Sequence, residues 1–321
     1  MQYRRKLIAL SVLVGTLALV YSASLIFDPE LRDARSASFS LLDNKALASV
    51  TRIVMSKGSD LTNLEKRDGR WLVLRDATAF PAKAERVTDL LSALSAVAVY
   101  PRVSSTASAH EALALTDGEA SRITVFGSAE KPLLDLLLGE ADAAGKNVHL
   151  RFAASDETFS GLDRFSSFFT GAQRSWFNLA FFAGDPIRPE DIQRISVRAK
   201  RPMRGESAGS SSGYTLARDA QRGWLLEGKR GTVDTMKADA YAKVLSSAEA
   251  DDFADADGGE TAVSIIIETG DGRSRTIDVS EAGADGRSVA AVSGSAHRYS
   301  LGQWNVERLV RDESHFLAAE R

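Results

Sequence analysis

The sequence contains no cysteine among its 321 residues. This absence excludes disulfide bonds, thiolate metal ligands, cysteine nucleophiles and the attachment of a lipid to cysteine. It does not assign a compartment, because a chain without thiols is suited to either side of a membrane.

The sequence also lacks an excess of charge of one sign. Its 40 lysines and arginines against 43 aspartates and glutamates give a net charge of −3. A nearly neutral chain lacks the broad basic surface that nucleic-acid binding requires, so we expect no nucleic-acid partner. The hydrophobic fraction of 44% is typical of globular proteins, and the length is sufficient for two domains.

Motifs for catalysis and for metal binding are missing as well. The four histidines, none at metal-ligand spacing, are His110, His149, His297 and His315. There is no GxxxxGK[ST] motif, and no GxGxxG motif follows a strand. The acidic run at residues 249–260 fails as a calcium loop, because Phe253 and Ser264 fall where the first and last ligands belong. We therefore predict a non-enzymatic protein with no catalytic residues, cofactor or metal; a hydrolase with paired carboxylates is the least favoured alternative.

Only one long apolar run is present, at residues 7–27. Its 21 residues carry no charge and follow Arg4, Arg5 and Lys6. A helix of this length spans about 31 Å, enough to cross the hydrocarbon core, and the basic residues predict a cytoplasmic N-terminus. A cleaved signal peptide with its site at residues 22–24 is the alternative. Because the apolar run continues to Phe27, the pattern favours a single-pass signal anchor in the lipid bilayer.

The chain repeats itself. RDGRWLVL at residues 67–74 returns as RDAQRGWLLE at residues 218–227. Each copy reads as two strands, a helix (residues 83–99 or 237–253) and four further strands joined as hairpins. The hairpins predict the α+β class: an N-terminal transmembrane helix followed by two tandem repeats, each a mostly antiparallel sheet with one covering helix.

The spacing of apolar residues predicts which side chains face each core. In the first helix the predicted buried residues are Val87, Leu90, Leu91, Leu94 and Val97, with Pro81 placed to start the helix. In the second helix they are Ala240, Val244 and Leu245. Trp71 and Trp224 each follow a tight turn, and we expect their indoles to pack under the helices. Stacking against a ligand is the alternative role for these tryptophans.

These features together predict the domain boundaries. They are a cytoplasmic stub and transmembrane anchor (1–27), a linker (28–46), a first repeat (47–163), an aromatic connector (164–190) and a second repeat (191–321).

The aromatic connector carries an unusual density of rings. They are Phe165, Phe168, Phe169, Trp176, Phe177, Phe181 and Phe182. One interpretation is a helical connection whose rings fill a seam between the two domains. The other is an exposed patch that docks a partner or touches the bilayer, which makes these seven residues the candidate partner-binding residues.

Several stretches together resemble a known bacterial family. They are GRWLVL, AERVTDLLSALSAV, EALALTDGEASRITVFG, LLLGE, RSWFNLAFF and IQRISV. This combination resembles the family named domain of unknown function 4340. The sequence departs from the family pattern after the first helix, where EALAL replaces the usual Tyr-Gly-Leu.

The resemblance implies a protein anchored in the bacterial cytoplasmic (inner) membrane and encoded beside ABC-transporter subunits of the gliding-motility auxiliary type. It transfers no catalytic residue. We therefore expect a non-enzymatic, membrane-anchored accessory subunit of an ABC-transporter-type complex, with its bulk extracytoplasmic (periplasmic), that acts through protein–protein interaction with the membrane subunits. The alternative is an extracytoplasmic module that binds envelope polysaccharide or peptide.

Overall fold

The computed structural model describes residues 38–199, 213–229, 231–255 and 258–318. The chain forms two compact units that divide between Trp176 and Phe177. The predicted anchor, residues 7–27, lies outside the described residues. Within the described ranges, no helix is both long enough and apolar enough to cross a membrane.

The first unit is built on a nine-stranded sheet. Its strands, in spatial order, are β5 (Thr78–Pro81), β4 (Arg70–Arg75), β3 (Asp60–Arg67), β2 (Arg52–Lys57), β8 (Ser121–Phe126), β9 (Pro132–Ala141), β10 (Asn147–Phe152), β11 (Thr158–Leu162) and β7 (Arg102–Ser104). A small second sheet pairs β1 (Ser38–Phe39) with β6 (Ala98–Val99). The helices are α3 (Asn44–Leu47), α4 (Ala84–Ser95) and α5 (Ser166–Phe169), with 3-10 turns η1 (Ala107–Ala109) and η2 (Gln173–Trp176).

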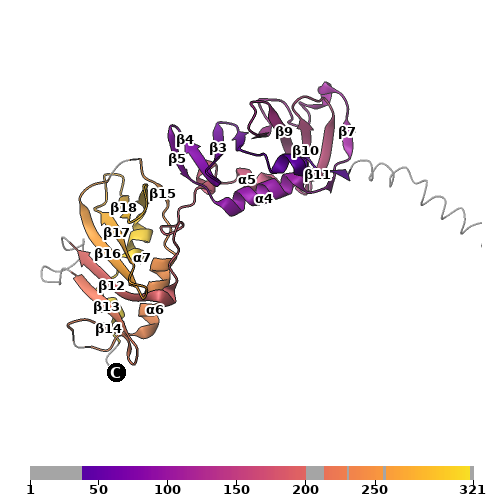
Figure 1. Ribbon diagram of the computed structural model, residues 1–321. Helices are drawn as coiled ribbons and strands as arrows, with labels where there is room; N and C mark the ends of the chain where they lie inside the picture. Colours follow the sequence, from indigo (N-terminus) through magenta and orange to yellow (C-terminus); the bar gives the residue numbers. More distant parts are fainter. Residues whose placement is uncertain (1–37, 200–212, 230, 256–257, 319–321) are drawn as a thin grey trace, which may run out of the picture. The chain divides into compact units, whose positions relative to one another are not determined.

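Alternation of apolar residues gives this sheet one buried face. In β2, Ile53 and Met55 are buried while their neighbours are partly exposed. Helix α4 runs along one face of the sheet (Figure 1) and buries Val87, Leu90 and Leu94. These side chains recur at helical spacing, so a single stripe of α4 closes the core.

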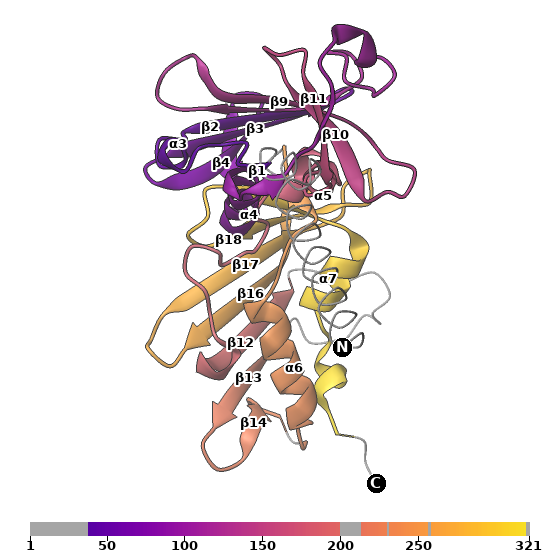
Figure 2. The ribbon, with the colours of Figure 1, turned by 90° about the vertical axis from the view of Figure 1, so that its right-hand side faces the viewer.

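The second unit has an eight-stranded sheet. Its order is β14 (Gly223–Leu226), β13 (Gly213–Asp219), β12 (Ile192–Ala199), β16 (Thr261–Thr269), β17 (Ser274–Ser280), β18 (Ser288–Val292), β19 (Arg298–Leu301) and β15 (Asp252–Phe253). Helices α6 (Thr235–Ser246) and α7 (Gln303–Leu309) lie on one face of it (Figure 2), and 3-10 turns η3 (Pro189–Asp191) and η4 (Glu313–Phe316) complete the unit.

The two sheets have the same strand order, apart from β5, and every strand pair is antiparallel. The predicted α+β class with mostly antiparallel sheets is therefore confirmed. The registers also agree: Ile53 pairs with Leu64 and Leu64 with Val73, as Ile195 pairs with Leu216 and Leu216 with Leu226. Trp71 and Trp224 consequently occupy equivalent positions, two residues before the last member of each row.

The helix boundaries and faces differ from the sequence prediction at five residues. Leu91 is only partly buried, because Val87, Leu90 and Leu94 form the buried stripe of α4. Val97 follows the end of α4 and is 68% exposed, because the helix stops at Ser95 and the chain becomes extended. Ala240 is exposed, because Ala238, Tyr241, Ala242 and Leu245 form the buried stripe of α6, and Val244 is only partly buried. Pro81 ends the edge strand β5 and starts no helix, which suits a residue without an N–H.

The predicted linker also differs from the structure in its second half. Residues 38–46 fold as part of the first unit, because Leu41 and Leu42 are buried. The Leu42 N–H donates to the Leu94 carbonyl at 2.9 Å, which fixes this segment to the end of α4. The folded part of the chain therefore begins at least as early as Ser38.

The two tryptophans pack beneath the helices to different degrees. Trp224 is 2% exposed, and its Nε1 donates to Asp239 Oδ1 on α6 at 2.8 Å. Arg218 lies over its ring and donates to the same carboxylate. Trp71 is only partly buried, although its strand contacts α4 in the same way. The structural role expected for Trp224 is thus observed in full, and that of Trp71 in part.

Candidate functional site

The aromatic connector is divided between the two units, and its first half belongs to the first unit. Phe165 and Trp176 are fully buried there, and Phe168 stacks on Trp176 with 6.0 Å between ring centroids. The Trp176 carbonyl accepts the N–H of Lys83 at 2.8 Å, directly before α4. Arg86 of α4 lies 4.8 Å from the centroid of the Trp176 ring. This half of the segment therefore closes the end of the core under α4.

The second half of the aromatic connector belongs to the second unit. Phe177, Phe181 and Phe182 are all at most 6% exposed. Phe177 meets Phe253 edge-on at 5.3 Å, and Phe181 lies 5.0 Å from Tyr299. Six of the seven predicted partner-binding rings are thus core residues of one unit or the other. The segment forms two short helical turns, α5 and η2, where the sequence suggested a continuous helical connection.

Phe169 is the one ring of the seven that remains partly exposed. It lines a hollow of about 410 Å³ in the first unit, which Lys57, Glu119 and Glu140 also line. The hollow lies where a loop crosses β9 at Gly139, and a Cβ at Gly139 would lie 2.1 Å from the Leu113 carbonyl oxygen. One of the predicted site residues thus reaches a concave surface of the first unit.

The clearest opening for a partner lies at the edge of the second sheet. In the first unit β5 pairs with the outer side of β4, and the Ala82 N–H donates to the Trp71 carbonyl at 3.0 Å. In the second unit β14 is the terminal strand, and no described strand pairs with its outer side. In the part of the chain that the structure describes, the edge that β5 covers in one copy is therefore uncovered in the other.

The hydrogen-bond pattern shows which groups this edge presents. The Glu227 N–H donates to the Thr215 carbonyl at 2.9 Å, so the backbone groups of Leu225 point inward as well. By alternation, the N–H and C=O groups of Trp224 and Leu226 point outward. Both side chains are nevertheless buried, so these outward backbone groups, for which no described strand supplies a partner, adjoin the core. We call this feature, residues 223–226, the β14 edge.

The described part of the chain that follows β14 does not fold back along the β14 edge as β5 does along β4; its residues Thr232 and Val233 pair with the C-terminal residues. Thr232 accepts the N–H of Ala318 at 2.9 Å, and Val233 forms an isolated bridge with Leu317. Phe316, fully buried against Tyr214 and Tyr241, fills the core beside it. The C-terminal residues thus pair with the chain that leads into α6, in place of a strand equivalent to β5.

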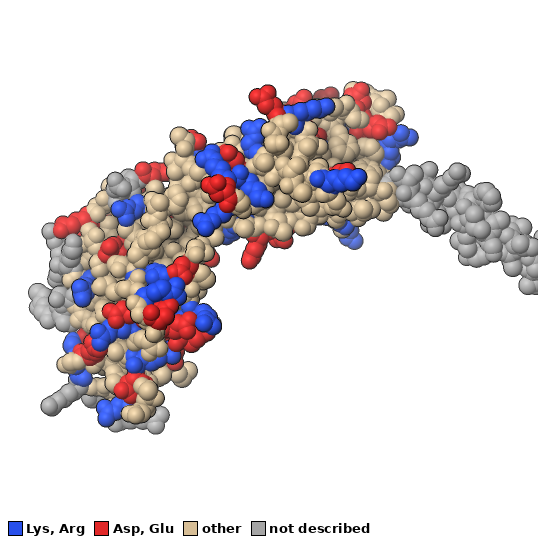
Figure 3. All heavy atoms as spheres, in the orientation of Figure 1, with Lys and Arg blue, Asp and Glu red and all other residues tan. Residues whose placement is uncertain are grey.

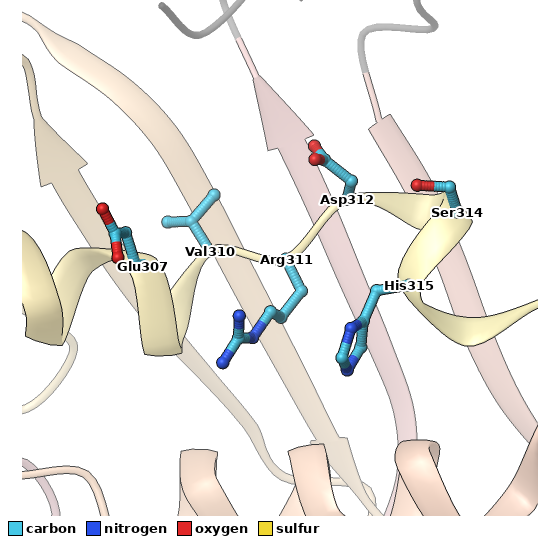
Figure 4. A pocket seen from close by; sticks show the side chains of 6 residues that line it. All are labelled: Glu307, Val310, Arg311, Asp312, Ser314 and His315. Carbon is cyan, nitrogen blue, oxygen red and sulfur yellow. The ribbon is translucent and has the colours of Figure 1, made fainter. Parts of the chain in front are cut away.

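A polar hollow of about 440 Å³ lies beside the turn between α7 and η4. Figure 4 shows Arg311 and His315 on one side of this segment and Asp312 on the other. Burial lowers the pKa of His315, and the nearby cations of Arg311 and Lys237 lower it further. At neutral pH the imidazole is therefore neutral and can both donate and accept hydrogen bonds.

Two buried tyrosines belong to the same region. The Tyr241 hydroxyl donates to the Leu309 carbonyl at 2.7 Å, at the end of α7. The Tyr214 hydroxyl is buried and reaches no described group with hydrogen-bond geometry. Burial, and after it the neighbouring Tyr241, raises the pKa of Tyr214. The two hydroxyls thus remain neutral and are structural in effect.

Other residues considered in the sequence are scattered. His149 lies on β10 and His297 directly precedes β19, and no group of metal-binding side chains occurs among the described residues. In the acidic run at 249–260, the Asp251 carboxylate accepts the Gly302 N–H at 2.6 Å. That carboxylate therefore holds the start of α7 in place.

Sequence reasoning did not identify the β14 edge. One signal was present: two residues separate β4 from β5, whereas the matching stretch after β14 reads EGKRGTV, with two glycines and two basic residues. Such a stretch has low strand propensity.

Comparison with known proteins gives one match. The model of the family described as domain of unknown function (DUF4340) matches residues 71–263, which is more than half of the chain. No curated protein and no solved structure matches.

Proposed function

The chain belongs to the DUF4340 family, and from this premise we propose that it is a non-enzymatic accessory subunit, anchored by residues 7–27 in the bacterial cytoplasmic membrane, with its two sheets on the extracytoplasmic side. It acts by binding a membrane subunit of an ABC-transporter-type complex. The family resemblance implies that partner, and the uncharged run at residues 7–27 supports the anchor.

The β14 edge is the observation that carries the proposal. A strand added to an open sheet edge gains main-chain hydrogen bonds, and pockets for its alternate side chains give specificity. The first unit offers an internal precedent, since β5 occupies the same edge and buries Phe80 beside Val73. An extended loop of a partner protein is the ligand that such an edge accepts.

Photo-crosslinking in native membranes tests this function. A photoreactive residue replaces Leu225, whose side chain is partly exposed on the free strand. The matched control replaces Leu72, which has the equivalent register position and similar burial but lies on a strand covered by β5. We expect position 225 to crosslink to a transporter membrane subunit and position 72 to give no such product. Equal crosslinking at both positions, or none to a membrane protein, refutes the proposal.

The second candidate function is an extracytoplasmic module that binds envelope polysaccharide or peptide. The hollow in Figure 4 favours it, because the guanidinium of Arg311 and the neutral imidazole of His315 lie side by side on one side of the segment that lines it. Such groups hydrogen-bond the hydroxyls and amides of a polar ligand. Native mass spectrometry with envelope fragments distinguishes the two functions: binding that Arg311→Ala and His315→Ala abolish, with wild-type crosslinking unaffected, favours the module.

A further inference from the structure

Exposed apolar side chains gather at one end of the first unit. Among the described residues, nine large apolar side chains are exposed, and four of these belong to this end. They are Val97 (68% exposed), Val99 (49%), Val103 (49%) and Leu162 (55%). We call these four residues the apolar edge.

The strand pairing places the four residues together. β7, which contains Val103, pairs with β11, which ends in Leu162. The Ser160 N–H donates to the Pro101 carbonyl at 3.0 Å, and a Cβ at Gly161 would lie 3.4 Å from the Val99 carbonyl oxygen. The segment from Val99 to Val103 therefore lies alongside β11, and Val97 precedes it by two residues.

The fold does not require these side chains to be apolar. The core beneath them is completed by other residues, because Tyr100 is fully buried and Phe39 packs 5.1 Å from its ring. β7 (Arg102–Ser104) is also the terminal strand of its sheet, and its one apolar side chain, Val103, is 49% exposed. Apolar side chains gathered at an exposed sheet edge favour association with another surface. These side chains therefore indicate a surface that is covered in the cell.

The short length of chain between the anchor and the first unit points to the bilayer as the surface that covers the apolar edge. Ser38 of β1 pairs with Val99, so the described chain begins at the apolar edge. Ten residues separate Ser38 from Phe27, the end of the uncharged run. Fully extended, ten residues span at most about 35 Å, so the anchor holds this end of the unit within reach of the bilayer surface.

The surroundings of the apolar edge suit a lipid headgroup layer. Lys146 lies beside Leu162, since its carbonyl accepts the Asp163 N–H at 2.9 Å, and Arg164 follows two residues later. In Figure 3, uncharged atoms cover much of the first unit on the face in view. Apolar side chains with adjacent basic residues are typical of surfaces that insert shallowly into a bilayer.

We propose that the apolar edge rests on the outer surface of the same bilayer that holds the anchor, with its four side chains inserted at the level of the headgroups. This inference rests on the proposed function, because it requires residues 7–27 to be membrane-bound. In this arrangement the end of the first unit that carries the apolar edge faces the membrane.

The absence of cysteine makes a direct test simple. Val99→Cys and Leu162→Cys, each labelled with a polarity-sensitive fluorophore, are made in the full chain and reconstituted in nanodiscs containing zwitterionic and anionic lipid. Leu133→Cys is the matched control, since Leu133 is 40% exposed but lies at the start of β9. It is about 25 Å along that strand from Ala141, which is in one row with Val148 of β10 and Gly161 of β11. We expect the labels at 99 and 162 to shift to the blue, to be quenched by lipids with spin-labelled headgroups, and to be protected several-fold from aqueous iodide relative to position 133.

The other outcomes overturn the inference in distinguishable ways. If the nanodiscs carry the protein but all three labels remain equally open to iodide, the docking is refuted while the anchor stands. If positions 99 and 162 are protected from iodide without lipid quenching, a second copy or a protein partner covers the edge in place of lipid. If the full chain does not associate with nanodiscs at all, the anchor fails, and the proposed function fails with it.

Discussion

Truncation of Trp224 is the sharpest test of the duplicated architecture, because the equivalent residue of the other copy provides a control. Trp224 is 2% exposed and donates its indole N–H to Asp239 Oδ1 at 2.8 Å, while Trp71 is partly buried. Replacing a buried tryptophan by alanine removes packing and leaves a cavity, at a cost of roughly 3–5 kcal/mol. We expect Trp224→Ala to reach this range and Trp71→Ala to remain below about 3 kcal/mol.

Native-state hydrogen exchange measures the loss of stability separately in α6 and in α4, the helices that pack over the two tryptophans. Peptides that cover α6 report on Trp224→Ala, and those that cover α4 report on Trp71→Ala. A loss of 3–5 kcal/mol accelerates exchange through larger openings by roughly 10²- to 10⁴-fold. Trp224→Phe separates the hydrogen bond from the packing and should cost about 1–2 kcal/mol. Equal acceleration in both copies, or an α6 that exchanges as in the wild type, would contradict the packing described here.

Three further predictions follow from single contacts. Tyr241→Phe removes a buried hydrogen bond to the Leu309 carbonyl of α7 and should destabilise the protein by about 1–3 kcal/mol in thermal unfolding. Tyr214→Phe removes a hydroxyl that reaches no described group with hydrogen-bond geometry, so this variant should be neutral or stabilising. Gly139→Ala forces a Cβ to within 2.1 Å of a backbone oxygen and should cost about 1–3 kcal/mol, whereas Gly118→Ala, with nothing within 4 Å, should change the midpoint little. Hydrogen bonds from the Thr269 hydroxyl and from the backbone of the same turn lower the pKa of Asp271 to about 2. The ionised Asp271 therefore stabilises the fold above the ordinary carboxyl pKa, and this stabilisation is lost as the pH falls through about 2. A carbon-13 NMR titration of Asp271 with a midpoint near 4 would contradict this.

The sequence predicts the repeated elements well because their signals are local. The helical stripe of α4 records burial directly, so Val87, Leu90 and Leu94 are identified by spacing alone. The same reasoning fails at the ends of elements. Val97 continues the apolar period of α4, yet the backbone becomes extended after Ser95, and nothing in the spacing shows this.

The candidate site could not be predicted because it depends on pairing between distant segments. Whether β14 is covered depends on where the chain after Leu226 goes, and there Thr232 and Val233 pair with Ala318 and Leu317. The aromatic connector is an instructive case. Its composition suggests a partner surface, but Trp176 and Phe177, adjacent in sequence, are both buried, one in each unit.

The central claim is that this protein is a membrane-anchored subunit that binds a transporter component through the β14 edge. Its most direct test is purification of the tagged full chain from native membranes in mild detergent, with quantitative mass spectrometry of the bound proteins. Leu225→Lys places a charge against any incoming strand, and Leu72→Lys is the control on the strand that β5 already covers. The account predicts that a transporter membrane subunit copurifies with the wild type and with Leu72→Lys and is lost with Leu225→Lys. Purification of the chain without any transporter subunit, or equal recovery with both variants, would contradict it.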